Sequence, residues 1–198
     1  MSTCIVCQND TVRIRRMRDC TEDYALMSAW LSDPAVLQYY EGRDNPFNLD
    51  KVIEHFGPRT RGEGGENPCI LECGQWPVGY IQFYRADGED SILKESQVHK
   101  ALGDIQYQNP YGIDLFIGET DSWNKGIGTA VLRLLVDYLL DNHLADIILI
   151  DPQTWNKRAI RCYEKCGFKP LTILEKHELH EGQYRDNLIM AVRKNQSV

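Results

Sequence analysis

Apolar and polar residues alternate along the chain with two different periods, and each period predicts one kind of element. A period of two over residues 12–17 predicts a strand, whereas residues 19–30 carry apolar side chains at helical spacing. Further helices are expected at 49–56, 126–142 and 157–166, and further strands at 69–73, 78–84, 111–117, 147–150, 169–178 and 184–193. This order of strands and helices predicts a mixed α/β sandwich.

Two stretches lack a clear period. Residues 59–67 contain three glycines and are expected to form an exposed loop. Residues 87–110 are longer and polar, with an acidic excess contributed by Asp87, Glu89, Asp90, Glu95 and Asp104. A loop this long in a compact domain is usually functional or mobile, so it is expected either to close over a cationic ligand or to form a solvated surface.

Length and composition fit a single domain over residues 1–198. Hydrophobic residues make up 42% and charged residues 26%, the balance of an ordinary soluble globule. No apolar run is long enough to span a bilayer, and the first residues do not have the pattern of a signal peptide, so a cytoplasmic location is expected. The net charge of −7 disfavours a nucleic-acid partner and suits a small cationic one.

Seven cysteines form an odd number without the density of a disulfide framework, which favours free thiols in a reducing compartment. Cys4 and Cys7 have the CxxC spacing of a metal site. A structural zinc ion needs four ligands, and no second CxxC or CxxH follows. We therefore expect no metal.

The first chemical signal is the turn Trp123-Asn124-Lys125-Gly126-Ile127-Gly128-Thr129, between an expected strand and an expected helix. Backbone N–H groups at a helix start lack acceptors within the helix, and glycine lets a phosphate approach them closely. The turn is not GxGxxG, and it lacks the Gly-Lys-Ser/Thr ending of a P-loop. By itself it also fits a purely structural helix start.

The second signal lies about 30 residues further on, where Asn156 begins a helix, Tyr163 lies two turns later and Gly167-Phe168 ends it. With the upstream turn, this pattern resembles the GNAT acetyltransferases, strongly over residues 111–168. The resemblance implies a mixed, mostly antiparallel central sheet flanked by helices, with splayed central strands that hold acetyl-CoA. One departure is Trp123, which stands where the family usually has Gln or Arg.

The resemblance also implies roles for individual residues. The pyrophosphate of acetyl-CoA would rest on the turn, and Tyr163 would protonate the departing CoA thiolate, although Tyr163 also fits a packing residue. A phenol of pKa about 10 is only slightly weaker as an acid than a thiol of pKa about 8.5. The residues implied in cofactor binding are Phe116, Ile117, Lys125, Gly126, Ile127, Gly128, Thr129, Asn156 and Ala159.

Further segments resemble the aminoglycoside 6′-N-acetyltransferases: residues 39–44, 111–119, 150–161 and 177–182. The resemblance implies a polycationic acceptor whose 6′-ammonium must lose a proton before it attacks the thioester. Asp114 would accept that proton, or else be a solvated carboxylate at a strand edge. The residues implied in substrate binding are Tyr39, Glu41, Asp114, Asp151, Glu178 and Glu181.

Two other functions remain open at this point. The first is a GNAT enzyme acting on another amine, such as a polyamine or a peptide N-terminus. The second is a non-catalytic module that binds acyl-CoA, which the presence of both Asp114 and Tyr163 disfavours. We expect direct acetyl transfer in a ternary complex, because no cysteine lies in a recognisable nucleophile motif. A monomer and a homodimer are both compatible with the sequence.

Overall fold

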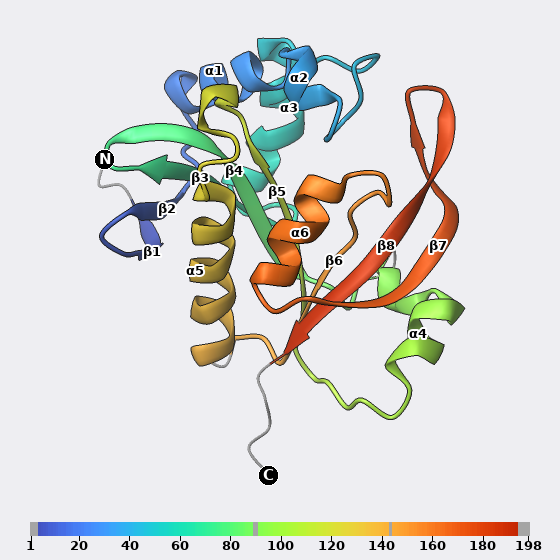
Figure 1. Cartoon of the computed structure of the whole chain (residues 1–198). Coiled ribbons are helices and arrows are strands. Elements are labelled where there is room, and N and C mark those ends of the chain that lie inside the picture. The colour runs from blue at the N-terminus through green and yellow to red at the C-terminus, as the bar shows by residue number, and fades with distance from the viewer. Residues whose placement is uncertain (1–3, 89–90, 143, 194–198) are drawn as a thin grey trace. The chain divides into compact units, whose positions relative to one another are not determined.

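The expected strands and helices occur in the expected order in the computed structural model, with further short elements between them (Figure 1). The chain divides into two compact units. The structure describes residues 4–88, 91–142 and 144–193; Glu89 and Asp90 of the expected acidic loop lie outside these ranges. Unit 1 comprises Met1–Phe83 and Asp114–Leu135, and unit 2 comprises Tyr84–Ile113 and Val136–Val198. The single domain expected over the whole chain stays a prediction.

Unit 1 is built on consecutive antiparallel strands. β1 (Ile5–Gln8) pairs with β2 (Val12–Arg16), β2 with β3 (Asn67–Cys73), and β3 with β4 (Trp76–Arg85). β3 and β4, both expected as strands, form a hairpin, whereas β1 was not expected. Its four residues are too few to establish a period of two against the polar residues that follow.

Helices α1 (Thr21–Trp30), α2 (Pro34–Leu37) and α3 (Leu49–Thr60) also belong to unit 1. Asn48 caps α3 by accepting a hydrogen bond from the N–H of Lys51 at 2.9 Å. α3 continues to Thr60, so the loop expected from residue 59 begins later. The apolar side chains pack into one core of unit 1, made by Met17, Tyr24, Met27, Trp30, Leu31, Val36, Phe47, Val52, Phe56, Ile70, Tyr80 and Phe116.

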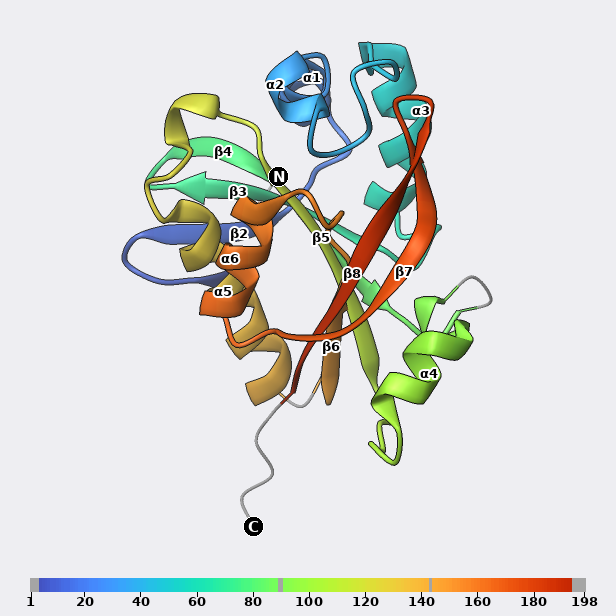
Figure 2. The same ribbon diagram turned by 45° about the vertical axis from the view of Figure 1, so that its right-hand side comes forward.

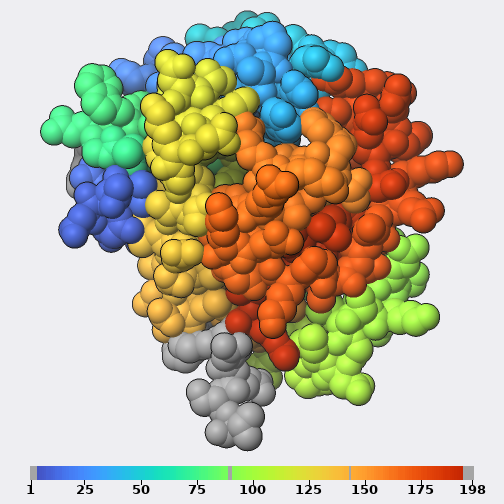
Figure 3. Space-filling view, viewed as in Figure 1, coloured from blue at the N-terminus to red at the C-terminus, as the bar shows by residue number. Residues whose placement is uncertain are grey.

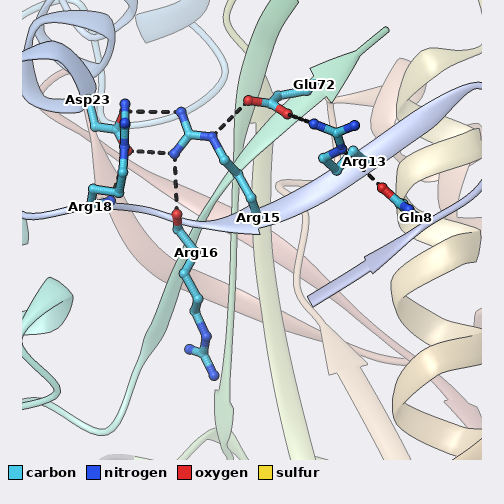
Figure 4. Close-up of polar contacts among 7 residues, drawn as sticks. All are labelled: Gln8, Arg13, Arg15, Arg16, Arg18, Asp23 and Glu72. Carbon is cyan, nitrogen blue, oxygen red and sulfur yellow. Dashed lines mark hydrogen bonds and ion pairs between the residues drawn. The ribbon is translucent and has the colours of Figure 1, made fainter. Parts of the chain in front are cut away.

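A buried ion-pair network joins β2, α1 and β3 in unit 1 (Figure 4). Arg15 makes two hydrogen bonds to the carboxylate of Asp23, at 2.6 and 3.0 Å, and a third to Glu72 at 2.7 Å. Arg15 is 4% exposed and Asp23 is 0% exposed. The backbone and side chain of Arg18 add further donors to Asp23. These ion pairs offset the free-energy cost of burying the charges of Arg15 and Asp23.

Unit 2 contains a parallel and two antiparallel pairings. β5 (Pro110–Ile117) pairs in parallel with β6 (Ile147–Ile150) through its first residues. β6 pairs antiparallel with β8 (Gln183–Arg193), which forms a hairpin with β7 (Lys169–His180). Figure 2 shows β7 and β8 as a long twisted ribbon.

Unit 2 has a core of its own, and part of it comes from the stretch expected to be a long loop. That expectation was wrong: the stretch contains a 3₁₀ turn at Ile92–Lys94 and helix α4 (Ser96–Leu102), which contacts β7. A seven-residue helix is too short to show a clear helical period. The core comprises Ala86, Leu93, Val98, Leu102, Ile147, Leu149, Leu174 and Ile189.

The helices that carry the two sequence motifs lie where they were expected. α5 (Ile127–Asp141) begins within the glycine turn, and α6 (Lys157–Lys165) follows β6. The orange α6 segment lies on the visible surface in Figure 3, with Lys157, Arg158, Arg161, Glu164 and Lys165 exposed. Within the described ranges, no helix has the length and apolar character needed to cross a membrane.

Candidate active site

Asp114, the expected general base, lies on β5 in the part that belongs to unit 1. Its Oδ2 accepts a hydrogen bond of 2.7 Å from Nε2 of Gln82 on β4. Gln82 is 6% exposed, although it lies in an otherwise apolar strand. The neutral amide therefore orients the carboxylate without cancelling its charge.

Gln82 is itself held in one orientation. Its Oε1 accepts hydrogen bonds from the hydroxyl of Tyr80 at 2.8 Å and from the guanidinium of Arg59 at 3.3 Å. An amide whose oxygen meets two donors must present its NH₂ group to Asp114. A chain of hydrogen bonds thus leads from Arg59 on α3 through Gln82 on β4 to Asp114 on β5, and it fixes the position of the candidate base.

Two tyrosines pack against Phe116, which lies two residues after Asp114 on β5. The Tyr40 ring lies 4.8 Å from the Phe116 ring, and the Tyr80 ring lies 5.6 Å from the same ring. Burial raises the pKa of the Tyr40 phenol well above its ordinary value, and the charges of Asp114 and Glu41 add to the increase. Tyr40 is therefore a neutral phenol near two carboxylates.

The glycine turn has the backbone geometry of an open helix start. Asn124 and Gly126 both have positive φ, of 60° and 82°, and an added Cβ at Gly126 would meet nothing within 4 Å. The N–H of Ala130 donates to the carbonyl of Gly126 at 3.0 Å. The first N–H groups of a helix have no acceptor inside the helix and can bind an anion.

Trp123, the departure from the family pattern, has a contact of its own. Its indole N–H donates to the carbonyl of Ile117, the last residue of β5, at 2.8 Å. Its ring lies 6.0 Å from Tyr39 in an edge-to-face arrangement. The indole therefore joins the turn to β5 and to the segment after α2. Two of the residues implied in substrate binding lie in the same unit: Tyr39 packs against Trp123, and Glu41 accepts a hydrogen bond from Asn45 at 3.2 Å.

In unit 2, Asn156 caps α6 as expected, because its Oδ1 accepts a hydrogen bond of 3.2 Å from the N–H of Ala159. Tyr163 is only 8% exposed and its ring lies 6.1 Å from that of Phe168. This burial is compatible with both the catalytic and the packing interpretation of Tyr163.

Two of the expected substrate-binding carboxylates meet in unit 2. Nδ2 of Asn187 donates to Oδ2 of Asp151 at 3.3 Å and to Oε2 of Glu178 at 3.0 Å. Glu178 also accepts a hydrogen bond of 2.7 Å from Gln153. The third, Glu181, lies in the two-residue turn of the β7–β8 hairpin with a positive φ of 49°.

The amides that orient these carboxylates were not predicted from the sequence. Gln82 interrupts the apolar run of β4, and Asn187 is a buried polar residue before the apolar end of β8. A single polar residue inside such a strand was the available signal. Its partner could not be read from the sequence, because Gln82 and Asp114 are 32 residues apart.

Comparison with known proteins identifies the class. The family described as Acetyltransferase (GNAT) domain matches residues 19–176. The chain therefore belongs to the GNAT acetyltransferases, and its α/β fold with an open mixed sheet and flanking helices confirms the predicted fold class.

Within that class, the chain groups with the aminoglycoside 6′-N-acetyltransferases. It is 30% identical to aminoglycoside N(6′)-acetyltransferase type 1 of Klebsiella pneumoniae over 161 residues, covering 81% of this chain and 75% of the relative. A kanamycin resistance protein of Rhizobium radiobacter is 43% identical over 58 residues, covering 29% of this chain and 54% of that protein.

Solved structures agree with this grouping. The crystal structure of aminoglycoside acetyltransferase AAC(6′)-Ib with coenzyme A and kanamycin has a TM-score of 0.72 and 26% identity, covering 93% of this chain and 95% of that one. A spermidine N-acetyltransferase from Vibrio cholerae has a TM-score of 0.71 at 16% identity, covering 93% of this chain and 96% of that one. The latter likeness shows the fold alone.

Proposed function

We propose that this enzyme transfers the acetyl group of acetyl-CoA to the 6′-amine of an aminoglycoside, in one step within a ternary complex. The observation that carries the proposal is the 30% identity to an aminoglycoside N(6′)-acetyltransferase over 81% of the chain. Asp114, held by Gln82, supplies a carboxylate of the kind the reaction needs. We further propose a cytoplasmic enzyme, monomeric or homodimeric.

The acceptor amine is the chemical difficulty of this reaction. A protonated amine with a pKa of about 10 cannot attack a thioester, and its deprotonation at pH 7 costs about 4–5 kcal/mol. Asp114 attracts the ammonium and then takes its proton, directly or through a water molecule. The neutral amine adds to the thioester carbonyl, and the C–S bond of the tetrahedral adduct then breaks as Tyr163 donates a proton to the departing thiolate. The nitrogen, positively charged after the addition, loses its extra proton to the Tyr163 phenolate or to water, which gives the neutral amide.

The cofactor contacts in this proposal are mostly backbone contacts. The N–H groups of the turn from Lys125 to Thr129 would bind the pyrophosphate at the positive end of α5. Phe116 and Ile117 at the end of β5, with Asn156 and Ala159 at the start of α6, would complete the contacts to acetyl-CoA. Coenzyme A is bound in the solved structures of AAC(6′)-Ib.

The proposal is tested by measuring free-CoA release with kanamycin, spermidine and a short peptide as separate acceptors. Rapid release with kanamycin, and a product acetylated at the 6′-nitrogen by mass spectrometry and NMR, is the expected result. Preferred turnover of spermidine or the peptide would replace the proposed acceptor by another amine. Binding of acetyl-CoA without turnover of any acceptor would indicate a non-catalytic module.

Gly126→Val is expected to raise the KM for acetyl-CoA by about 10- to 100-fold, the loss of one or two hydrogen bonds to a charged group. A β-branched residue cannot readily adopt a φ of 82°, so the turn must change its backbone. Gly65→Val is a matched control, because Gly65 also has a φ of 82° and open space around it but lies outside the turn. An unchanged KM in folded Gly126→Val would remove the turn from the cofactor site.

Single replacement of Cys69, Cys73, Cys162 or Cys166 by alanine is expected to leave acetyl transfer in place. Burial raises the pKa of the Cys69 thiol to about 12 and that of Cys7 to about 11, so neither thiol forms a thiolate readily near pH 7. Steady-state rates and mass spectrometry of the parent enzyme with acetyl-CoA test this. Loss of all activity in one folded variant, with an acetyl adduct on the same cysteine of the parent, would contradict direct transfer.

A further inference from the structure

We propose that Asn187 is a positioning residue that holds Asp151 and Glu178 together as one binding site for an ammonium group of the acceptor. The inference rests on the proposed function and deepens it. Asn187 is 2% exposed on β8, and its Nδ2 donates to the carbonyl of Asp151 at 2.9 Å as well as to both carboxylates. One buried amide therefore joins the residue after β6 to β7.

The orientation of this amide follows from its neighbours. A rotated amide would place Oδ1 against three oxygen atoms, so Nδ2 must face Asp151 and Glu178. Among the described residues, Oδ1 of Asn187 is buried and has no hydrogen-bond partner. A buried acceptor without a donor is costly, so the three contacts of Nδ2 decide which way the amide faces.

The charge of the site suits a cation. The Nε2 group of Gln153 and the Nδ2 group of Asn187 donate to Glu178 as neutral amides, which orient its carboxylate but leave its negative charge. The imidazole of His180 lies 3.8 Å from Glu178, and it carries charge only when protonated. An ammonium group has three donors and no acceptor, which matches two adjacent carboxylates.

A bulge in β7 brings Glu178 into reach of Asn187. Leu174 is paired with Asn187, whereas Glu178 is paired with Arg185, so residues 175–177 stand opposite Asp186 alone. In a regular pairing, residue 176 would occupy the place opposite Arg185, and Glu178 would lie opposite Gln183, two pairs further from Asn187. Side chains two residues apart share a face of the sheet, so Glu178, opposite Arg185, lies on the face of Asn187, and the bulge brings it closer to Asn187 along the strand.

The bulge is held by a single residue in an unusual conformation. Lys176 has a φ of 51°, its side chain is exposed, and its N–H donates to Oδ1 of Asp186 at 2.8 Å. Glycine adopts this backbone conformation without strain, whereas valine resists it. Lys176 thus offers a way to change the position of Glu178 without touching either carboxylate or Asn187.

The first experiment removes the amide. Asn187→Ala is expected to raise the KM for kanamycin by about tenfold or more, with kcat changed by no more than about twofold and the KM for acetyl-CoA unchanged. Asn142→Ala is the control, since Asn142 is exposed at the end of α5 and donates to a backbone carbonyl. The dissociation constant of kanamycin for the CoA-loaded enzyme, measured by calorimetry, should rise in parallel.

The second experiment compares Lys176→Val with Lys176→Gly, which lose the same charge. The valine variant should weaken kanamycin binding by about tenfold and the glycine variant should bind like the parent. If Asn187→Ala fails to fold, the comparison of the two Lys176 variants still tests the proposed subsite. Equal kanamycin dissociation constants in the parent, Asn187→Ala and Lys176→Val would overturn the inference.

Binding and turnover separate this inference from the proposed function. A parent enzyme that binds kanamycin without acetylating it would defeat the proposed function, while the variants' dissociation constants would still judge the subsite. A parent that acetylates kanamycin, with variants that bind it equally well, would defeat the subsite alone. No binding of kanamycin to the CoA-loaded parent would defeat both.

Discussion

Replacement of Asp114 by asparagine is expected to lower kcat/KM for an aminoglycoside by about 10²- to 10⁴-fold, the usual contribution of a general base. Asparagine keeps an oxygen that accepts the 2.7 Å hydrogen bond from Gln82, so the local geometry should persist. The substitution removes the proton acceptor and the negative charge together. The KM for acetyl-CoA should change little.

The pH dependence separates a base from a simple anchor. As pH rises, more of the acceptor amine is already neutral, so the defect of Asp114→Asn should shrink if Asp114 takes the proton. If Asp114 only binds the ammonium, KM rises, kcat stays, and the loss does not shrink specifically as the amine deprotonates. Steady-state rates of the parent and the variant over a pH series with kanamycin decide between these roles.

Asp137→Asn provides a control of equal charge, because Asp137 is exposed on α5. It should retain the rate of the parent at every pH. A near-parental kcat/KM for Asp114→Asn across the same series would refute the assignment of Asp114 itself.

Local signals in the sequence predicted the parts of the fold that depend on neighbouring residues. Asn156 caps α6 and Gly182 lies in the β7–β8 turn, as their positions before a helix and between two strands indicated. Gly126 takes a positive φ at the start of α5, as a glycine in such a turn would. Each of these features depends only on residues within about four positions of it in the sequence.

The parts that could not be predicted depend on pairing between distant strands. Gln82 reaches Asp114 because β4 lies beside β5, and Asn187 reaches Asp151 because β8 lies beside β6. The position of Glu178 additionally depends on a three-residue bulge. The carboxylates were predicted from the resemblance to the family, but the amides that orient them follow only from strand order and register.

The second large effect concerns the folding of unit 1. Asp23→Asn is expected to lower the free energy of unfolding by about 3–5 kcal/mol, because it removes the fully buried carboxylate that pairs with Arg15 and leaves the buried guanidinium with Glu72 as its remaining charged partner. Asp23 is 0% exposed and receives two hydrogen bonds from Arg15. Urea denaturation measures the loss. Glu63→Gln is the control, because it interrupts the exposed pair of Glu63 with Arg61 and should barely move the midpoint.

The contribution of the Asp23 carboxylate to stability should also depend on pH in the acidic range. Burial alone would raise the pKa of Asp23, but the hydrogen bonds from Arg15 and Arg18 outweigh burial and lower it. A carboxylate with a lowered pKa in the folded state stabilises that state above its unfolded pKa of about 3.9 and loses this contribution as pH falls through the folded-state value. The stability difference between the parent and Asp23→Asn should thus be constant from about pH 7 to 5 and shrink below about pH 4. A loss no larger than that of Glu63→Gln, or a difference that stays constant down to about pH 2, would contradict the role of this network.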